Sequence, residues 1–126
     1  MVRGSISNTS TANLVLFLGL VFLTTVVSSK EWVVGDDKGW TSHIEHLWPG
    51  GRPIHGGDVL VFKYASSAHN VVEVDKAGYD SCSPGAGART YSSGNDRITL
   101  PRGTSYFICS FPGHCKNGMK ISVTAQ

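Results

Sequence analysis

The sequence has little excess charge of either sign. Its 11 Lys and Arg residues are nearly balanced by 9 Asp and Glu residues, which gives a formal net charge of +2. Only Arg3 among these lies before position 30, so the rest of the chain carries 10 basic and 9 acidic residues, a net charge of +1. Nucleic-acid-binding domains normally show a basic stripe. The balance therefore argues against a nucleic-acid partner.

The chain also lacks a long segment with the 3.6-residue period of an amphipathic helix. Its 15 glycines and 5 prolines are scattered without a repeat, which argues against a collagen-like chain and a long helical bundle. Neither a Gly-x-Ser-x-Gly nucleophile elbow, a P-loop nor a His-Glu-x-x-His motif occurs. The 126 residues are enough for one ordinary domain, and we do not expect an enzyme.

The long apolar run of the sequence lies close to its N-terminus. Arg3 precedes a stretch rich in Ser, Thr and Asn, then the apolar residues 14–27, and small residues at Val27 and Ser29 suit cleavage. This order is typical of a secretory signal peptide. As a helix the run would rise about 21 Å, short of a hydrocarbon core of about 30 Å. An uncleaved membrane anchor is therefore the weaker interpretation.

These features predict a signal peptide over residues 1–29 and a secreted, soluble domain over residues 30–126. The C-terminal sequence KISVTAQ has no apolar tail of the kind that a lipid-anchor signal requires. We therefore expect no permanent membrane anchor.

Short runs rich in β-branched and aromatic residues alternate with turns that contain Gly and Pro. Residues 77–82 are consistent with one short helical turn and equally with a loop. The pattern predicts an all-β domain with two sheets and Greek-key connections. The predicted strands are residues 31–34, 58–64, 70–74, 97–100, 105–109 and 120–124.

Cysteine is scarce, and its count of 3 is odd. An oxidising compartment pairs two thiols and leaves the third over. One thiol therefore needs a function of its own.

The segment CSFPGHCKNGM, residues 109–119, carries the densest chemistry in the sequence. It places a thiol at Cys109, an imidazole at His114 and a thioether at Met119 on a loop between two predicted strands. His69 lies at the start of another predicted strand. Two imidazoles, one thiolate and a weak axial thioether form the ligand set of a blue-copper electron-transfer site.

Taken singly, these residues have ordinary explanations. A Met beside a strand usually fills the core, and a lone His near a loop is usually a surface group. Zinc also takes Cys and His, but structural zinc sites usually have four such ligands and Met is a poor one. The combination therefore favours one copper ion. The remaining histidines, for which we expect surface positions, are His43, His46 and His55.

A set of short motifs runs through residues 30–126. They are WVVG (32–35), GW (39–40), GDVLVF (57–62), HNVV (69–72), YFIC (106–109), FPGHC (111–115) and GMK (118–120). As a set they resemble the phytocyanins, plant members of the cupredoxin family, and most of all the plantacyanin (basic blue protein) branch. Met119 at the axial position, in place of Gln, argues against the stellacyanin branch.

The resemblance implies a cupredoxin-like Greek-key β-sandwich of about seven strands with one or two short helical turns. It also implies copper ligation by His69, Cys109, His114 and Met119, and single-electron transfer by Cu(II)/Cu(I) cycling. We expect a monomer, secreted to the apoplast or cell wall.

The resemblance further implies a disulfide bond between Cys82 and Cys115. Either pairing that used Cys109 would remove the proposed thiolate ligand, which agrees with this choice. Such a crosslink would contribute roughly 4 kcal/mol by chain-entropy reasoning. Since Cys115 follows His114 directly, it would also hold the ligand loop.

The partner is not identified by the sequence and is expected to be a small-molecule or protein redox partner. Phe111, Pro112 and Gly113 flank His114 and suit an apolar docking rim, although turn formation and core packing explain them equally well. The alternative function is extracellular signalling in the cell wall or reproductive tissue, with copper structural or incidental. Catalysis ranks behind both, because four protein ligands leave no open position for a substrate.

Overall fold

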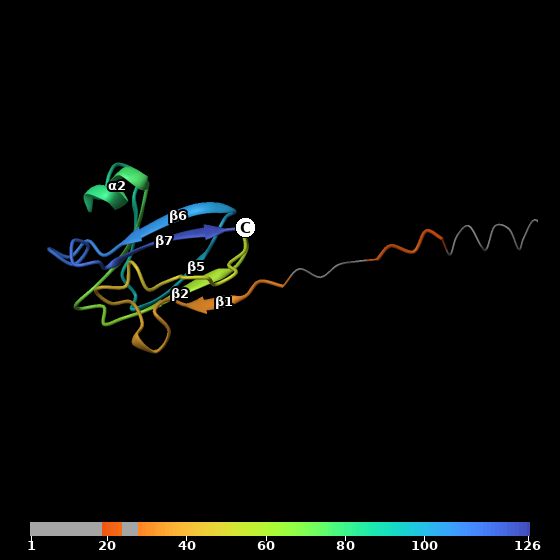
Figure 1. Cartoon of the computed structure of the whole chain (residues 1–126), viewed down its shortest axis with the longest axis horizontal. Helices are drawn as coiled ribbons and strands as arrows, with labels where there is room; N and C mark the ends of the chain where they lie inside the picture. Colours follow the sequence, from red (N-terminus) through yellow and green to blue (C-terminus); the bar gives the residue numbers. More distant parts are fainter. Residues whose placement is uncertain (1–18, 24–27) are drawn as a thin grey trace, which may run out of the picture.

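The computed structural model describes residues 19–23 and 28–126, so the predicted signal peptide lies largely outside the described residues. Within these residues, seven strands form two sheets, which confirms the predicted all-β sandwich (Figure 1). The three-stranded sheet has the order β1 (Glu31–Val33), β2 (Val59–Lys63), β5 (Asn95–Thr99). The four-stranded sheet has the order β4 (Arg89–Tyr91), β3 (Val71–Val74), β6 (Gly103–Ile108), β7 (Lys120–Ala125).

The chain passes repeatedly between the two sheets. Strand β1 pairs parallel to β2, whereas every other pairing is antiparallel. The connections β2 to β3, β4 to β5 and β5 to β6 all cross from one sheet to the other. This path places the start of β3 beside the end of β6, because these two neighbours run in opposite directions.

Alternating burial along the strands builds the core between the sheets. In β7, Ile121 and Val123 are fully buried, whereas Ser122 is partly buried and Thr124 is exposed. Three aromatic rings meet at the centre: Phe62 lies 5.1 Å from Trp40 and 5.2 Å from Phe107, centroid to centroid. Such edge and tilted contacts add to the stabilisation from area burial.

Two short helical segments accompany the strands: η1 (Asp36–Lys38) and α2 (Lys76–Ser81). The α2 segment settles the choice between helix and loop that the sequence left open. Its N-cap is Asp75, whose carboxylate accepts from the Gly78 N–H at 2.7 Å. Gly78 weakens the helix propensity, but a Cβ there would lie 2.9 Å from the Ser83 carbonyl oxygen. Tertiary packing therefore requires glycine at position 78, although this glycine makes the helix hard to predict from the sequence.

Strand β4 was absent from the sequence-based prediction, and this is a correction. It has three residues, Arg89 and Thr90 are exposed, and it forms the edge of its sheet. Its pairing with β3 defines it, with Val71 opposite Tyr91. A short polar edge strand carries no alternating apolar pattern, so the signal used for the other strands was missing.

The disulfide bond joins Cys82 to Cys115, with a Cα–Cα distance of 5.7 Å. Cys82 caps the C-terminal end of α2, so the bond ties that helix to the segment between β6 and β7. Cys109 is free and buried. The structure therefore has the Cys82–Cys115 disulfide bond and the unpaired Cys109 that the resemblance implies. Across the described ranges 19–23 and 28–126, no helix combines the length and apolar character needed to cross a membrane.

Candidate metal centre

The hairpin of β6 and β7 positions three of the four candidate ligands. Its last paired residues are Ile108 and Lys120, so the loop over residues 109–119 leaves and re-enters the sheet at one point. Cys109 begins this loop, Met119 ends it, and His114 lies between them. The loop is closed from within: the Cys109 N–H donates to the Met119 carbonyl, and the Met119 N–H to the His114 carbonyl, both at 3.0 Å.

His69 reaches the same place from another strand. It lies just before β3, and Val72 of β3 pairs with Ile108 at the end of β6. Antiparallel pairing therefore brings a residue some forty positions upstream beside Cys109. The pairing of β3 with β6 is thus the reason that the loop ligands meet a second imidazole.

The donor atoms of His69, Cys109 and His114 converge. The two Nδ1 atoms are 3.1 Å apart, Cys109 Sγ lies 3.5 Å from His114 Nδ1, and all three lie within 4.8 Å of one another. Cys109 and Met119 are fully buried, whereas the two histidines are partly exposed. Burial, followed by the nearby His114 ring, lowers the pKa of His69 and favours its neutral form. A neutral imidazole is the form that binds a metal.

The residues that follow two of these ligands tie their segments together. Asn70 is buried, and its side chain accepts from the Ser110 N–H at 2.9 Å and donates to the Ser110 hydroxyl at 2.8 Å. The backbone carbonyl of Asn70 accepts from the Trp40 indole N–H at 2.8 Å. These contacts hold His69 and Cys109 at a fixed separation. Sequence reasoning did not assign this role to Asn70, because its partners lie 30 and 40 residues away.

Comparison with known proteins agrees with this arrangement. A family profile described as a plastocyanin-like domain matches residues 40–119. Chemocyanin from Lilium longiflorum is 53% identical over 111 residues, covering 88% of this chain and 87% of that protein. The chain belongs to the phytocyanin family. Phytocyanins are non-enzymatic blue copper proteins, which agrees with the expectation that this chain is not an enzyme.

Solved structures of other phytocyanins share the fold. Cucumber basic protein, described as a blue copper protein, matches with a TM-score of 0.74 and 52% identity, covering 76% of this chain and 99% of its own. Spinach plantacyanin matches with a TM-score of 0.60 and 62% identity, covering 61% of this chain and 85% of its own. In this phytocyanin, the donor set of His69, Cys109, His114 and Met119 is consistent with a type 1 copper site.

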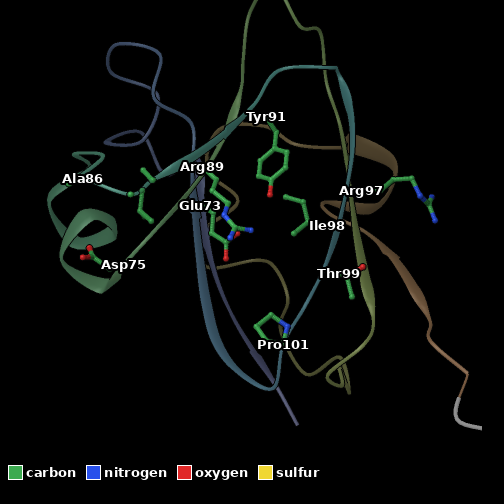
Figure 2. A pocket seen from close by; sticks show the side chains of 13 residues that line it. Glu73, Asp75, Ala86, Arg89, Tyr91, Arg97, Ile98, Thr99 and Pro101 are labelled. Carbon is green, nitrogen blue, oxygen red and sulfur yellow. The ribbon is translucent and has the colours of Figure 1, made fainter.

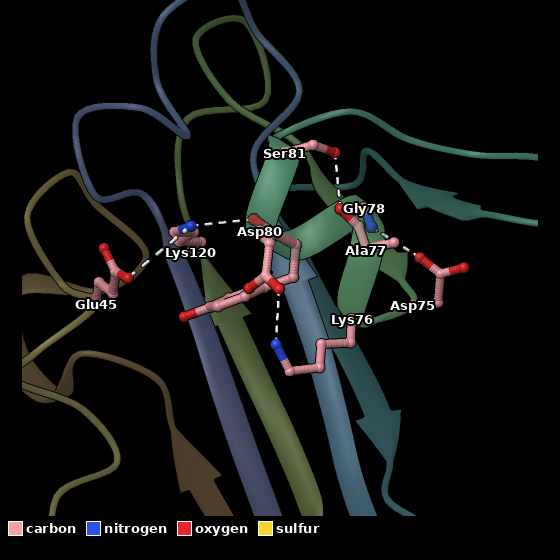
Figure 3. A network of polar contacts seen from close by, with 9 residues as sticks. Glu45, Asp75, Lys76, Ala77, Gly78, Asp80, Ser81 and Lys120 are labelled. Carbon is pink, nitrogen blue, oxygen red and sulfur yellow. Dashed lines mark hydrogen bonds and ion pairs between the residues drawn. The ribbon is translucent and has the colours of Figure 1, made fainter.

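A second segment braces the ligand loop of this phytocyanin from outside. The N–H groups of Ile44 and Glu45 both donate to the Gly118 carbonyl, at 3.0 and 3.1 Å. The Lys120 ammonium lies 3.9 Å from the Glu45 carboxylate and donates to the Tyr79 carbonyl at 3.0 Å (Figure 3). The loop around Ile44, the ligand loop and α2 are therefore connected around Met119.

The remaining histidines occupy the surface, as predicted from the sequence: His43, His46 and His55 are all exposed. Within the described part of the chain, the cluster of His69, Cys109 and His114 is the one group of His, Cys, Asp and Glu with metal-binding spacing.

The proposed docking rim divides into two kinds of residue. Phe111 is partly buried and packs against the core, and its ring stacks on His114 with centroids 5.8 Å apart. Pro112 and Gly113 are exposed. Phe111 thus supports the position of the His114 ring, while its neighbours face solvent.

A separate cavity of about 600 Å³ is lined by residues of β4 and β5, which are edge strands of the two sheets (Figure 2). None of the candidate copper ligands lines it, and its walls include Glu73, Arg89, Tyr91 and Thr99. The metal centre is therefore not part of this cavity.

Proposed function

We propose that this phytocyanin carries single electrons by means of one copper ion held by His69, Cys109, His114 and Met119. The convergence of two imidazole nitrogens and one thiol sulfur within 4.8 Å supports the proposal most directly. Bound copper would supply the Cu(II)/Cu(I) couple. The thiolate and thioether suit Cu(I), while the imidazoles suit both oxidation states.

The chain's own contribution is to hold the donors in place. Hydrogen bonds within the loop fix Cys109 and Met119 relative to His114, and Asn70 fixes His69 relative to Cys109. A framework fixed in this way limits atomic rearrangement when the charge at the site changes. Little rearrangement favours fast electron exchange.

The visible spectrum of the copper-loaded protein tests the assignment. We expect an intense blue colour from charge transfer between the Cys109 thiolate and Cu(II), and its loss in Cys109→Ser. Cys82 and Cys115 are already paired, so no other free thiol among the described residues replaces Cys109. Circular dichroism of the variant controls for folding. A colourless oxidised holoprotein would show that the assignment is wrong.

We further propose that electrons cross at the partly exposed His114 edge, with Phe111, Pro112 and Gly113 forming the docking rim. The partner would be a small molecule or a protein with an apolar contact surface. Phe111→Ser should slow electron exchange with such a partner several-fold, measured by stopped-flow absorption. An unchanged rate with an unchanged spectrum would remove Phe111 from the rim.

We also propose that the protein is secreted. The disulfide bond between Cys82 and Cys115 fits an oxidising compartment such as the extracellular space. The predicted signal peptide over residues 1–29 gives the route.

A further inference from the structure

Asp58 is a buried carboxylate whose hydrogen-bond donors are all neutral. It is 5% exposed. One oxygen accepts from the Lys30 backbone N–H at 3.0 Å, and the other accepts from the Trp32 indole at 3.0 Å and the His55 N–H at 2.9 Å. Within residues 19–23 and 28–126, no basic side chain lies within ion-pair distance of this carboxylate. The Lys30 ammonium lies instead over the Trp32 ring, 4.2 Å from its centroid.

A buried carboxylate of this kind calls for a positive partner. Burial by itself raises the pKa of Asp58, but the N–H donors from Trp32, Lys30 and His55, together with the charge interaction with the His55 ring, outweigh it and hold the pKa below its usual value. Asp58 is therefore ionised at neutral pH. Buried charges are costly unless they are paired as well as hydrogen-bonded, and this one has hydrogen bonds but, in the described part of the chain, no ion-pair partner at contact distance.

Cleavage of the peptide bond before Lys30 would create a positive charge beside Asp58, at the Lys30 backbone nitrogen. Ser28, Ser29 and Lys30 are exposed, and the Lys30 carbonyl accepts from the Val59 N–H at 2.9 Å, which anchors the residue beside β2. The predicted signal peptide ends at Ser29. Cleavage there would convert the nitrogen that already contacts Asp58 into an α-amino group.

We propose that Asp58 is the receptor for the mature N-terminus, and that the processing site is the Ser29–Lys30 peptide bond. Hydrolysis adds one water: the carboxylate stays on Ser29 and leaves with the leader, and the Lys30 nitrogen takes up protons to become an ammonium. That ammonium pairs with Asp58. The inference rests on the proposed removal of the leader and is independent of copper.

The geometry selects Lys30 among neighbouring positions. Cleavage one or two residues earlier would place the ammonium on Ser29 or Ser28 and leave a neutral amide at Asp58. Cleavage one residue later would delete the donor nitrogen and the backbone bond to Val59. Only cleavage of the Ser29–Lys30 bond therefore places the ammonium at Asp58 and also keeps the backbone hydrogen bond between Lys30 and Val59.

The pair has a defined pH range. The α-ammonium should have a pKa above its unfolded value of about 8, so its stabilisation is complete below that pH and is lost as pH rises through the raised pKa. Asp58 has a lowered pKa, so its part is complete above about pH 4 and is lost as pH falls through the lowered value. The other groups facing this site are His55, the Lys30 side chain and Gln126.

A double-mutant cycle tests the proposal. The full chain is expressed through a secretory host, with leaders that yield proteins beginning at Lys30 or at Ser28, each with Asp58 or with Asp58→Asn. Cucumber basic protein, matched over 99% of its length by 76% of this chain, shows that a phytocyanin of this extent folds. At pH 6.5, beginning at Lys30 should lower the unfolding equilibrium constant about tenfold relative to Ser28, about 1.4 kcal/mol. This gain should vanish in Asp58→Asn, and an equal gain there would overturn the pairing.

Two measurements on the unmutated protein complete the test. Titration of the Lys30 α-amino group by NMR should give a pKa above its usual value of about 8, and an ordinary pKa would overturn the pairing. The intact mass of the protein secreted from the native leader should correspond to a start at Lys30, and any other start would overturn the processing site. The visible spectrum of the same sample reports separately on the proposed copper function.

Discussion

Met119 is the weakest of the four proposed copper ligands, and its thioether is soft and neutral. Its side chain is fully buried, and its backbone is bonded to both Cys109 and His114. A neutral thioether favours the reduced metal more than an amide oxygen does. The identity of this one side chain should therefore adjust the reduction potential without altering the rest of the site.

Replacing Met119 with Gln should lower the reduction potential, because an oxygen donor stabilises Cu(II) relative to Cu(I). Voltammetry of the purified protein measures the change, and retention of the visible colour controls for an intact site. An unchanged or raised potential would show that Met119 is not a ligand.

Among single residues, the sequence was sufficient to propose the loop ligands, but it did not indicate the residues that support them. Cys109, His114 and Met119 share one short segment, so their spacing alone indicated a site. The bonds from Asn70 to Ser110 depend on the pairing of β3 with β6. No local pattern reports a contact between residues 40 positions apart.

The ligand loop and the loop around Ile44 form a pair of elements that meet at Gly118. Gly118 has φ +81°, and a Cβ there would lie 3.1 Å from the His43 Cα. His43 itself adopts φ +64° and donates its N–H to Asn117 at 3.0 Å. Both sides of this contact are backbone, so neither moves away easily.

Gly118→Ala should therefore destabilise the protein by about 2–3 kcal/mol, from left-handed strain of about 1–2 kcal/mol plus the steric contact. Gly113→Ala is a matched control, because Gly113 also has φ +81° but has nothing within 4 Å of its Cβ position. Urea unfolding of the metal-free proteins measures both. Equal losses would show that the contact with His43 contributes nothing.

The strands show where sequence patterns predict elements well. β2 and β7 have β-branched residues and alternating or continuous burial, and each agrees with its prediction to within a residue at either end. β5 begins at Asn95 and β6 at Gly103, each two residues before the start of its predicted strand. Cross-strand pairing extends these strands through residues of low β propensity.

At the scale of the whole molecule, the disulfide bond compensates for a small core. A domain of this size buries only about 60–65% of its unfolded surface. The bond links Cys82 to Cys115 over a sequence separation of 33. It thereby restricts the unfolded chain across β4, β5 and β6.

The double variant Cys82→Ala/Cys115→Ala should lose roughly 4 kcal/mol of unfolding free energy. Urea unfolding of the metal-free protein measures this without a contribution from bound copper. Cys109→Ser, which keeps the crosslink, is the control and should lose much less. A loss below about 1 kcal/mol in the double variant would contradict the expectation.

The pairing of Ile108 with Lys120 has an evolutionary consequence. Residues 109–119 leave and re-enter the sandwich through this single closing pair. Residues can thus be inserted or deleted between Cys109 and Met119 without shifting the register of β6 against β7. A different loop would fit the same scaffold only if it kept the contacts of Ser110 with Asn70, Cys115 with Cys82 and Gly118 with Ile44.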